Sequence, residues 1–435
     1  MIWNPEYECM DRAALRELQL RRLQMTVAWV YERVPYYRRR LEECGVRPRD
    51  IRTLDDVRRL PFTDESALRE AFPFGMSALP LDEVVRVHSS SSAAGTPVVV
   101  GYSRGDLNTW AELTARVAAA AGVQRGDLVQ MAFPYGMSTA AWGLHYGIER
   151  LGATIIPAGG GQTARQLQMM RDFGTTVLVS TPSYALRLAA RAEELGFGRG
   201  QLRLRLGLFG GEPCGARRRA AIEERLGVRA SDNYGLSEVM GPGIAGECEL
   251  ACGLHLNEDH FLAEVVDPGS GEPVAYGEEG ELVLTTLTKE AFPVLRFRTR
   301  DLTSLDPSRC ACGRTLARMA KVSRRSDDML IVRGVNVYPR QVGEALTAAH
   351  GRPPRYVVVL EEREGVDELE VVVEVGEDVF SDVMADVVGY QERLAAYLRD
   401  ALGLRAAVRL VEPGTIAAMG AGTGAVLDRR PPDSF

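Results

Sequence analysis

The chain has 435 residues, of which 46% are hydrophobic and 26% are charged. Such fractions are typical of globular proteins and exclude a collagen-like, disulfide-scaffolded or largely disordered chain. The length fits one large domain followed by a smaller one. The formal net charge of −7 gives no general attraction to nucleic acid, because phosphate binding depends on clustered positive charge.

Lysine is almost absent from the chain. Lysine and arginine together number 52, yet Lys289 and Lys321 are the only two lysines. Any reaction step that needs a lysine ammonium group must therefore use one of these two positions.

Residues 1–12 are polar and do not resemble a secretory signal. Nor does any segment reach the roughly 18 consecutive apolar residues of a membrane span. We therefore expect a cytoplasmic protein without a membrane or nucleic-acid partner; its oligomeric state, a homodimer included, stays open. In that compartment the 7 cysteines are reduced, which favours metal binding or burial over disulfides.

The predicted elements change character along the chain. Residues 1–75 carry leucines at helical spacing and predict a helical lead-in to the large domain. Within residues 76–326, apolar runs alternate with helical stretches such as 111–121, which predicts a mostly parallel sheet with helices on both faces. These runs lie at 98–102, 128–133, 154–157, 177–180 and 206–209. Polar and apolar residues then alternate at 261–266 and 280–286 and predict antiparallel strands.

Residues 327–435 predict a small α+β domain of their own. The expected order is strand 329–335, helix 340–350, strands 355–360 and 369–375, helix 381–402 and strand 407–411. The fold class is therefore α/β, with a large N-terminal domain and a small C-terminal one.

Several motifs rich in Gly, Asp and Arg follow one another. A serine-rich loop at 88–97 (HSSSSAAGTP) precedes a predicted strand, where its N–H groups could face phosphate; alone, it could equally be a flexible turn. Further motifs stand at 210–213 (GGEP), 233–242 (NYGLSEVMGP), 298–301 (RTRD) and 324–339 (RRSDDMLIVRGVNVYP). In order and spacing this set resembles the phenylacetate-CoA ligase family of adenylate-forming enzymes. The resemblance implies an adenylate-forming N-terminal domain and a small mobile C-terminal domain.

The resemblance also implies roles for individual residues. The Tyr234 ring would stack on adenine, Glu238 would help to hold Mg²⁺, and Asp301 would accept hydrogen bonds from the ribose. Arg325 would face phosphate, and Gly334 would leave room for the pantetheine arm of coenzyme A. Further cofactor-binding positions are Ser90, Ser91, Gly210, Gly211, Glu212, Pro213, Gly235 and the hinge residue Asp327. Each of these residues taken singly could be an ordinary turn or surface residue.

An acyl pocket is expected around residues 133–142. Its predicted wall consists of Tyr135, Gly136, Trp142, Tyr146 and Leu236. Aromatic side chains suit a planar apolar ligand, although periodicity alone favours a buried aromatic cluster. The resemblance favours an aryl carboxylate or its thioester.

The sequence departs from the family at two lysines. The phosphate loop has Thr96 in place of lysine, and Ser92, Ala93 and Ala94 replace a glycine and two threonines. The C-terminal motif has Gly422 where the family has its adenylation lysine. Removing a charge that stabilises a transition state costs about 10² to 10³ in rate. We therefore expect slow adenylation.

These departures favour ATP-independent acyl transfer between coenzyme A and the phosphopantetheine thiol of an acyl carrier protein, with ATP and Mg²⁺ in doubt. One alternative is an ATP-dependent aryl-CoA ligase, and another is a catalytically inactive binding subunit. His145 is a candidate base, against the alternative of a structural histidine. Cys214 is a candidate nucleophile, against the alternative of a buried thiol.

A structural zinc site is a further expectation. Cys310 and Cys312 form a short knuckle, and Cys248 and His255 lie some sixty residues earlier, with Cys252 and His260 nearby. Zinc takes thiolates and imidazoles from two such separated clips. Unliganded reduced cysteines are the alternative. We favour Cys248, His255, Cys310 and Cys312 as ligands.

Overall fold

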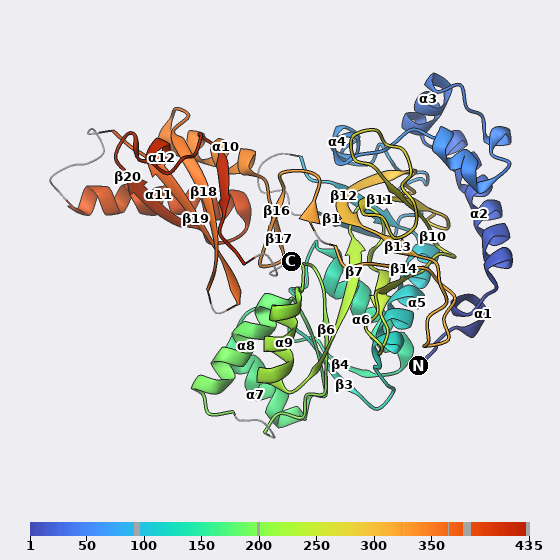
Figure 1. Ribbon diagram of the computed structural model, residues 1–435, viewed down its shortest axis with the longest axis horizontal. Helices are drawn as coiled ribbons and strands as arrows, with labels where there is room; N and C mark the ends of the chain where they lie inside the picture. The colour runs from blue at the N-terminus through green and yellow to red at the C-terminus, as the bar shows by residue number, and fades with distance from the viewer. Residues whose placement is uncertain (91–95, 198–200, 323, 364, 377–383, 432–435) are drawn as a thin grey trace.

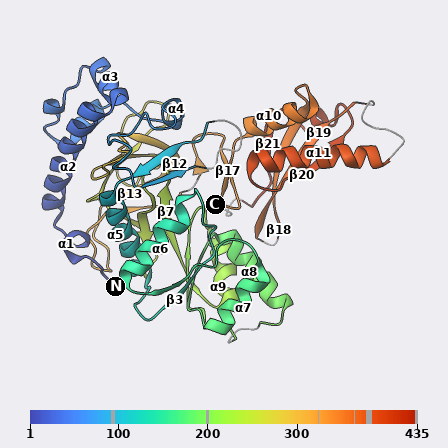
Figure 2. The same ribbon diagram turned by 180° about the vertical axis from the view of Figure 1, so that it is seen from behind.

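A computed structural model of the chain shows a large domain and a small one standing beside it (Figure 1). The structure describes residues 1–435 except 91–95, 198–200, 323, 364, 377–383 and 432–435. We call the part that follows strand β15 (Arg324–Arg325) the lid. Seen from both sides, the lid and the N-terminal helices lie at opposite ends of the molecule (Figures 1 and 2).

The lead-in is helical, as predicted. Its helices are α1 (Pro5–Glu8), α2 (Arg12–Arg33), α3 (Pro35–Glu43), the 3₁₀ turns η1 (Pro48–Asp50) and η2 (Leu54–Arg59), and α4 (Glu65–Glu70). Helix α2 begins where the Asp11 carboxylate accepts the N–H of Ala13. Its apolar face packs into the core of the large domain through Leu23, Val27 and Val30.

The large domain is built on a nine-stranded sheet of order β13-β14-β9-β8-β7-β6-β5-β3-β4. The strands are β3 (Leu128–Met131), β4 (Thr154–Ile156), β5 (Val177–Ser180), β6 (Leu206–Phe209), β7 (Arg229–Leu236), β8 (Gly241–Glu247), β9 (Leu254–Leu256), β13 (Leu305–Asp306) and β14 (Arg318–Met319). Pairing is parallel from β4 to β7, as predicted, and antiparallel from β7 to β13. The change falls at β8 because the connection from β7 is too short for a crossover helix.

Helices cover both faces of the parallel part. The helices are α5 (Arg104–Ala121), α6 (Thr139–Leu151), α7 (Thr163–Phe173), α8 (Pro182–Glu194) and α9 (Ala216–Leu226). In β5, Val177 and Val179 pack with α5 and α6, while Leu178 between them packs with α7, α8 and α9. A strand buried on both faces needs an unbroken apolar run, and this explains why its bounds could be read from the sequence.

A second, four-stranded antiparallel sheet has the order β10-β11-β12-β15. Its other strands are β10 (Phe261–Val266), β11 (Gly280–Thr286) and β12 (Phe297–Thr303). Strands β1 (Arg86–Ser89) and β2 (Val99–Tyr102) pair antiparallel as a separate hairpin. The predicted place of the run 98–102 in the parallel sheet is therefore wrong, because β2 pairs with β1 instead. The antiparallel strands predicted at 261–266 and 280–286 are confirmed.

The lid is an α+β unit with its own core. Its sheet has the order β20-β19-β18-β21, from β18 (Arg355–Arg363), β19 (Val366–Glu374), β20 (Ala407–Val411) and β21 (Ala425–Asp428). Its helices are α10 (Pro339–His350), α11 (Met384–Leu402) and α12 (Thr415–Ala418). The predicted start of α11 at 381 lies outside the described residues.

One predicted strand of the lid is wrong. The segment 329–335 is a hairpin of β16 (Leu330–Val332) and β17 (Val335–Val337). The chain turns at Arg333 and Gly334, which have φ values of +52° and +75°. Such left-handed backbone favours glycine and interrupts an otherwise apolar run.

None of the helices that the structure describes is both long and apolar enough to cross a membrane.

Candidate active site

A cavity of about 770 Å³ lies where the lid meets the large domain. Motifs far apart in the sequence line it together. Its wall includes Ser89, Ser90, Gly210, Gly211, Glu212, Pro213, Tyr234, Gly235, Leu236, Glu238, Asp301, Arg325, Asp327 and Gly334. The predicted nucleotide and coenzyme positions therefore share one site, apart from Ser91, which lies outside the described residues.

A hydrogen-bonded network connects four of the predicted site residues. The Tyr234 hydroxyl donates to Asp301 Oδ2 over 2.6 Å, and Arg325 Nη1 donates to Asp301 Oδ1 over 2.6 Å. Arg325 also donates to Asp327 through Nε and Nη2, at 2.7 and 2.9 Å. Asp301 and Arg325 are cross-strand partners on β12 and β15, which fixes their distance. Burial raises the pKa of the Asp301 carboxyl.

Two further carboxyl groups are unusually placed. Burial raises the pKa of Glu238 to about 7, and the negative Glu65 adds to this shift. Glu212 accepts the backbone N–H of Ser183 over 2.5 Å. A buried carboxyl group that lines a cavity, such as Glu238, fits a bound divalent cation, which would favour its charged form.

At Gly334 the backbone approaches the large domain so closely that a glycine is required. A Cβ atom on Gly334 would lie 2.9 Å from Thr181 Cγ2 of the large domain. Its φ of +75° also disfavours any side chain. The backbone at the β16–β17 turn thus runs directly against the large domain at one end of the cavity.

An arginine-lined groove continues from this point. It has a volume of about 590 Å³, and it shares Thr181 and Arg333 with the main cavity. Arg187 and Arg363 also line it. In the described part of the chain, neither Arg187 nor Arg333 forms an ion pair with a carboxylate, whereas Arg363 pairs with Glu368, which also lines the groove, over 3.2 Å.

Neither substituted lysine position lies on the cavity wall. Thr96 is exposed, and its carbonyl oxygen accepts Arg69 Nη1 over 2.7 Å. Gly422 lies on the lid between α12 and β21, and a Cβ atom there would have no heavy atom within 4 Å. Space for a lysine therefore exists at Gly422.

The predicted acyl-pocket wall needs correction. Leu236 lines the cavity, but Tyr135, Gly136, Trp142 and Tyr146 do not. On α6, Ala140 and Leu144 face the cavity, while Trp142, His145 and Tyr146 lie on another face of the same helix and gather into an aromatic cluster. Residues four apart share a helix face, so one helix cannot turn both sets toward the ligand.

That cluster is held by its own contacts. Trp142 Nε1 donates to the carbonyl oxygen of Gly136 over 3.0 Å, and the Arg86 guanidinium lies 4.7 Å from the Tyr146 ring centre. Phe133 and Ala140, within the predicted segment 133–142, do line the cavity, whereas Leu144, just beyond that segment, was missed. Leu144 could have been predicted from its spacing, because a residue four positions after Ala140 lies on the same helix face.

His145 does not reach the cavity. Its Nδ1 lies 2.9 Å from the Tyr135 hydroxyl and its Nε2 lies 3.1 Å from Glu149 Oε1. Both ring nitrogens thus have partners away from the cavity, which favours a structural histidine over the candidate base. Cys214 does line the cavity, but burial raises the pKa of its thiol to about 12, so it is not an activated nucleophile.

The structure adds Lys321 to the site. Lys321 lines the cavity, and its Nζ lies 2.5 Å from Asp232 Oδ2 and 3.5 Å from Glu247 Oε1. Lys289 is buried, and its Nζ donates to the carbonyl oxygen of Val239 over 2.7 Å. The rarity of lysine and the place of Lys321, just before the 324–339 motif, were signals that could have indicated it.

The four predicted zinc ligands lie together outside the cavity, at the antiparallel end of the nine-stranded sheet.

Comparisons with known proteins cover nearly the whole chain. A family model described as "AMP-binding enzyme" matches residues 80–287, and one described as "AMP-binding enzyme C-terminal domain" matches residues 334–430. The phenylacetate-coenzyme A ligase of Thermus thermophilus is 45% identical over 95% of this chain and 96% of its own. That of Escherichia coli is 44% identical over 96% of each chain.

Solved structures add information about the lid. A 2-hydroxyisobutyryl-CoA ligase with 2-HIB-AMP and CoA, in its thioesterification state, matches with a TM-score of 0.91 at 30% identity, covering 99% of this chain and 93% of its own. The same ligase in its postadenylation state matches with a TM-score of only 0.72, covering 98% and 92%. Both structures are of the same ligase, and this chain matches the one in the thioesterification state more closely.

Proposed function

Because this chain belongs to the phenylacetate-coenzyme A ligase family of AMP-binding enzymes, we propose that it joins an aryl carboxylic acid to coenzyme A through an acyl adenylate, consuming ATP. The family resemblance and the adenylate-forming α/β fold are thereby confirmed. The expectation of ATP-independent transfer gains no support, since the relatives above are ligases. The observation that carries the proposal is the single cavity that unites the nucleotide motifs with Gly334.

The nucleotide half of the cavity fits AMP chemistry. The Asp301 carboxylate accepts hydrogen bonds and would receive the ribose hydroxyls, while Arg325 beside it carries positive charge toward phosphate. The Tyr234 ring supplies a flat surface for adenine, since its hydroxyl is already held by Asp301. Glu238 would hold Mg²⁺, which neutralises phosphate charge when bound.

The acyl half is apolar. Phe133, Ala140, Leu144 and Leu236 line the cavity, and the small side chain of Ala140 leaves room for a ring. An aromatic side chain stacks on an aryl ligand and apolar neighbours exclude water from it. We propose an aryl acid as substrate on this basis.

Coenzyme A would enter through the arginine-lined groove. Arg187, Arg333 and Arg363 match the phosphate groups of its nucleotide end, and the Gly334 turn leaves a path for pantetheine toward the cavity. The closer match to a relative's thioesterification state supports a lid placed for this second half-reaction.

Two displacements make up the proposed reaction. A carboxylate oxygen of the acid attacks the α-phosphorus of ATP and pyrophosphate leaves. The coenzyme A thiol then attacks the acyl carbon, loses its proton to solvent, and AMP leaves. The chain contributes by holding both partners at one site out of water.

Acid-dependent exchange between ATP and labelled pyrophosphate tests the proposal. We expect exchange with one or more aryl acids, followed by formation of the aryl-CoA on addition of coenzyme A. Mass spectrometry would identify that product. Absence of exchange across a panel of aryl and alkyl acids, with a folded protein, would contradict the proposal.

A second candidate function rests on Thr96 and Gly422, where the family has lysines. It is transfer of an aryl group from aryl-CoA to a carrier-protein thiol without nucleotide, a nearly thermoneutral exchange. An incubation of aryl-CoA with a carrier protein and no ATP distinguishes the two candidates. A catalytically inactive binding subunit would do neither reaction.

A further inference from the structure

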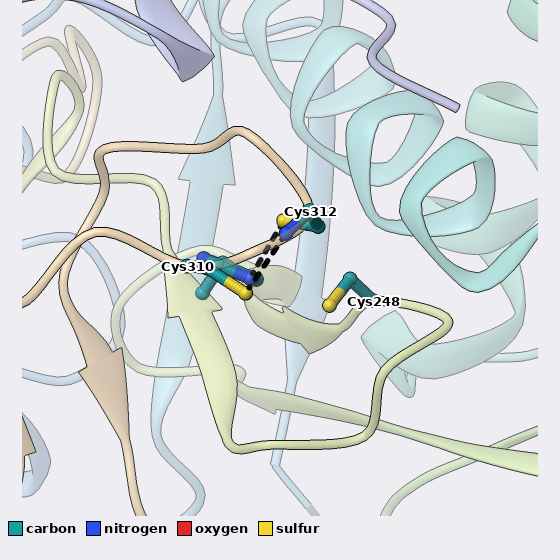
Figure 3. Close-up of side chains that lie close together, drawn as sticks. Cys248, Cys310 and Cys312 are labelled. Carbon is teal, nitrogen blue, oxygen red and sulfur yellow. Dashed lines mark hydrogen bonds between the residues drawn. The ribbon is translucent and has the colours of Figure 1, made fainter.

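Three thiols and one imidazole converge at the antiparallel end of the nine-stranded sheet. One ligand atom from each of Cys248, His255, Cys310 and Cys312 lies within 4.8 Å of the other three. Figure 3 shows the sulfur atoms of the three cysteines turned toward one another. This cluster shares no residue with the cavity wall.

Neighbouring strands bring the four side chains together. Cys248 directly follows β8, and His255 is the central residue of β9. Cys310 and Cys312 lie in the loop between β13 and β14, and β14 pairs with β9 so that Arg318 faces His255. The Cys310 loop turns back on itself, since the N–H of Cys312 points to Cys310 Sγ over 3.5 Å. The pairing of β9 with β14 thus joins two clips of ligands.

We propose that Cys248, His255, Cys310 and Cys312 bind one Zn²⁺ ion tetrahedrally. Zinc bonds of about 2.3 Å to sulfur and 2.0 Å to nitrogen place neighbouring ligand atoms roughly 3.5 to 3.8 Å apart. Cys312 Sγ lies 3.5 Å from His255 Nε2, already at that spacing. The remaining pairs need to approach by about 1 Å at most. Ligand atoms this close together fit one ion rather than a multi-iron cluster.

The site is closed, which indicates a structural role. Cys248, His255 and Cys310 are only 1%, 4% and 3% exposed. Four protein ligands leave no position for a substrate or a reactive water. Arg314 lies nearby, with Nη1 3.5 Å from Cys312 Sγ, and balances part of the negative charge of three thiolates.

Cys252 lies at the edge of this set. Its Sγ is 3.4 Å from Cys310 Sγ and 3.1 Å from Arg318 Nη1, but the residue is exposed. It belongs to the same turn as Cys248 yet lies outside the mutual 4.8 Å group. Cys252 is therefore the matched control for the four ligands.

The ion would hold together strands β9 and β14, which also contribute residues to the cavity wall. Leu254 stands next to the ligand His255 on β9 and pairs with Met319 on β14, and both residues line the cavity. On the outer side, Arg314 Nε donates to Glu8 Oε2 over 2.6 Å and holds the N-terminal segment. Zinc thereby stabilises one cavity wall and the attachment of helix α1.

Metal analysis of the full chain, purified without chelator, tests the proposal. We expect about one zinc per chain, and a visible absorption band typical of tetrahedral thiolate coordination after exchange with Co²⁺. Cys248→Ser and Cys310→Ser should each lose stoichiometric zinc. Cys252→Ser and Cys44→Ser should retain it, Cys44 being exposed at the end of α3.

Measurements on the wild-type chain alone can contradict the proposal, so the test does not depend on whether the variants fold. Protein without stoichiometric zinc whose chelator-treated form gives no Co²⁺ band would exclude the site. Zinc retained by Cys310→Ser, or lost by Cys252→Ser, would contradict this set of four ligands. None of these measurements depends on enzymatic activity.

Discussion

Arg218 of α9 donates a 2.8 Å hydrogen bond to Asp367, which lies on β19 of the lid, and both side chains are buried. The same guanidinium also lies 3.1 Å from Glu362 Oε2 on β18. These contacts cross from the large domain to the β18–β19 hairpin of the lid. Any rotation of the lid must break them and hydrate the charges, so they favour the present lid position.

Arg218→Ala should therefore impair the thioester-forming half-reaction selectively. Removing one partner of a buried ion pair costs about 3 to 5 kcal/mol. Because these ion pairs form only in the present lid position, the substitution destabilises that position alone. We expect thioester formation from preformed acyl adenylate and coenzyme A to slow at least tenfold. Pyrophosphate exchange should change less than threefold.

Arg225→Ala is the control for this variant. Arg225 lies on the same helix and forms a 2.9 Å ion pair with Glu193 near the surface, within the large domain. It should leave both half-reactions unchanged. Equal losses of both half-reactions in Arg218→Ala would indicate a general defect and contradict the role in lid position.

Gly334→Ala should block coenzyme A. The new Cβ would lie 2.9 Å from Thr181 Cγ2, in a backbone conformation with φ of +75°. We expect the KM for coenzyme A to rise or the thioester rate to fall, by roughly tenfold or more, while adenylation persists. Steady-state kinetics with coenzyme A varied would measure this change.

Gly351→Ala separates obstruction from backbone strain. Gly351 also lies in the lid and has a φ of +80°, but a Cβ there meets no heavy atom within 4 Å. It should cost about 1 kcal/mol of stability and leave the KM for coenzyme A unchanged. If both variants lost activity alike, strain rather than obstruction would explain Gly334.

Asp301→Asn should weaken ATP binding. The substitution removes the charge that pairs with Arg325 and the acceptor proposed for the ribose hydroxyls. Hydrogen bonds to charged groups contribute about 1.5 to 3 kcal/mol, so the KM for ATP should rise roughly 10- to 100-fold. Asp172→Asn, at an exposed ion pair with Arg171, should have no effect on that KM. An unchanged KM for ATP in Asp301→Asn would place the ribose elsewhere.

Much of this fold was predictable, and the reason differs between elements. The bounds of β5 and β6 follow from apolar runs buried on both helix-covered faces. The β16–β17 hairpin was missed because its turn depends on left-handed backbone at Arg333 and Gly334, within an apolar segment. Hydrophobic periodicity carries no signal for such a turn.

Site residues that belong to chemically distinctive motifs could be predicted from the sequence. Residues whose orientation depends on how a helix packs could not. Tyr234 and Asp301 line the cavity together, as their motifs indicated, because glycine-rich and charged motifs have few alternative roles. Trp142 was misplaced because aromatic residues serve a core cluster as well as a ligand, and only the rotation of α6 decides between them. That rotation is set by tertiary packing rather than by residue type.

Gly422→Lys should raise the adenylation rate if the missing charge limits it. The position is open, with no heavy atom within 4 Å of an added Cβ, so the lid should accept the side chain. A restored transition-state charge is worth about 10² to 10³ in rate, to be measured by pyrophosphate exchange. Gly422→Met adds a similar length without charge and should have no effect. Equal rates in both variants and the wild type would mean that another group supplies the charge.

The two lysines should contribute to stability with opposite dependence on pH. Burial lowers the pKa of Lys289 from 10.5 to about 8, whereas Asp232 and Glu247, acting against burial, raise the pKa of Lys321. Between pH 8 and 10.5 the unfolded chain holds a proton at Lys289 that the folded chain has released. The free energy of unfolding must therefore rise with pH across that window.

Comparison with Lys289→Met isolates this contribution. Relative to that variant, the wild-type chain should gain roughly 3 kcal/mol of stability between pH 8 and 10.5, measured by urea denaturation. Relative to Lys321→Met, the wild-type chain should instead lose stability as the pH rises, and only above pH 10.5. The stability that Lys321 contributes is present below its unfolded pKa of 10.5, and it is lost as the pH rises through the higher folded value. A wild-type chain whose stability relative to Lys289→Met stays flat across that window would show that the ammonium group of Lys289 is hydrated, and would contradict its burial.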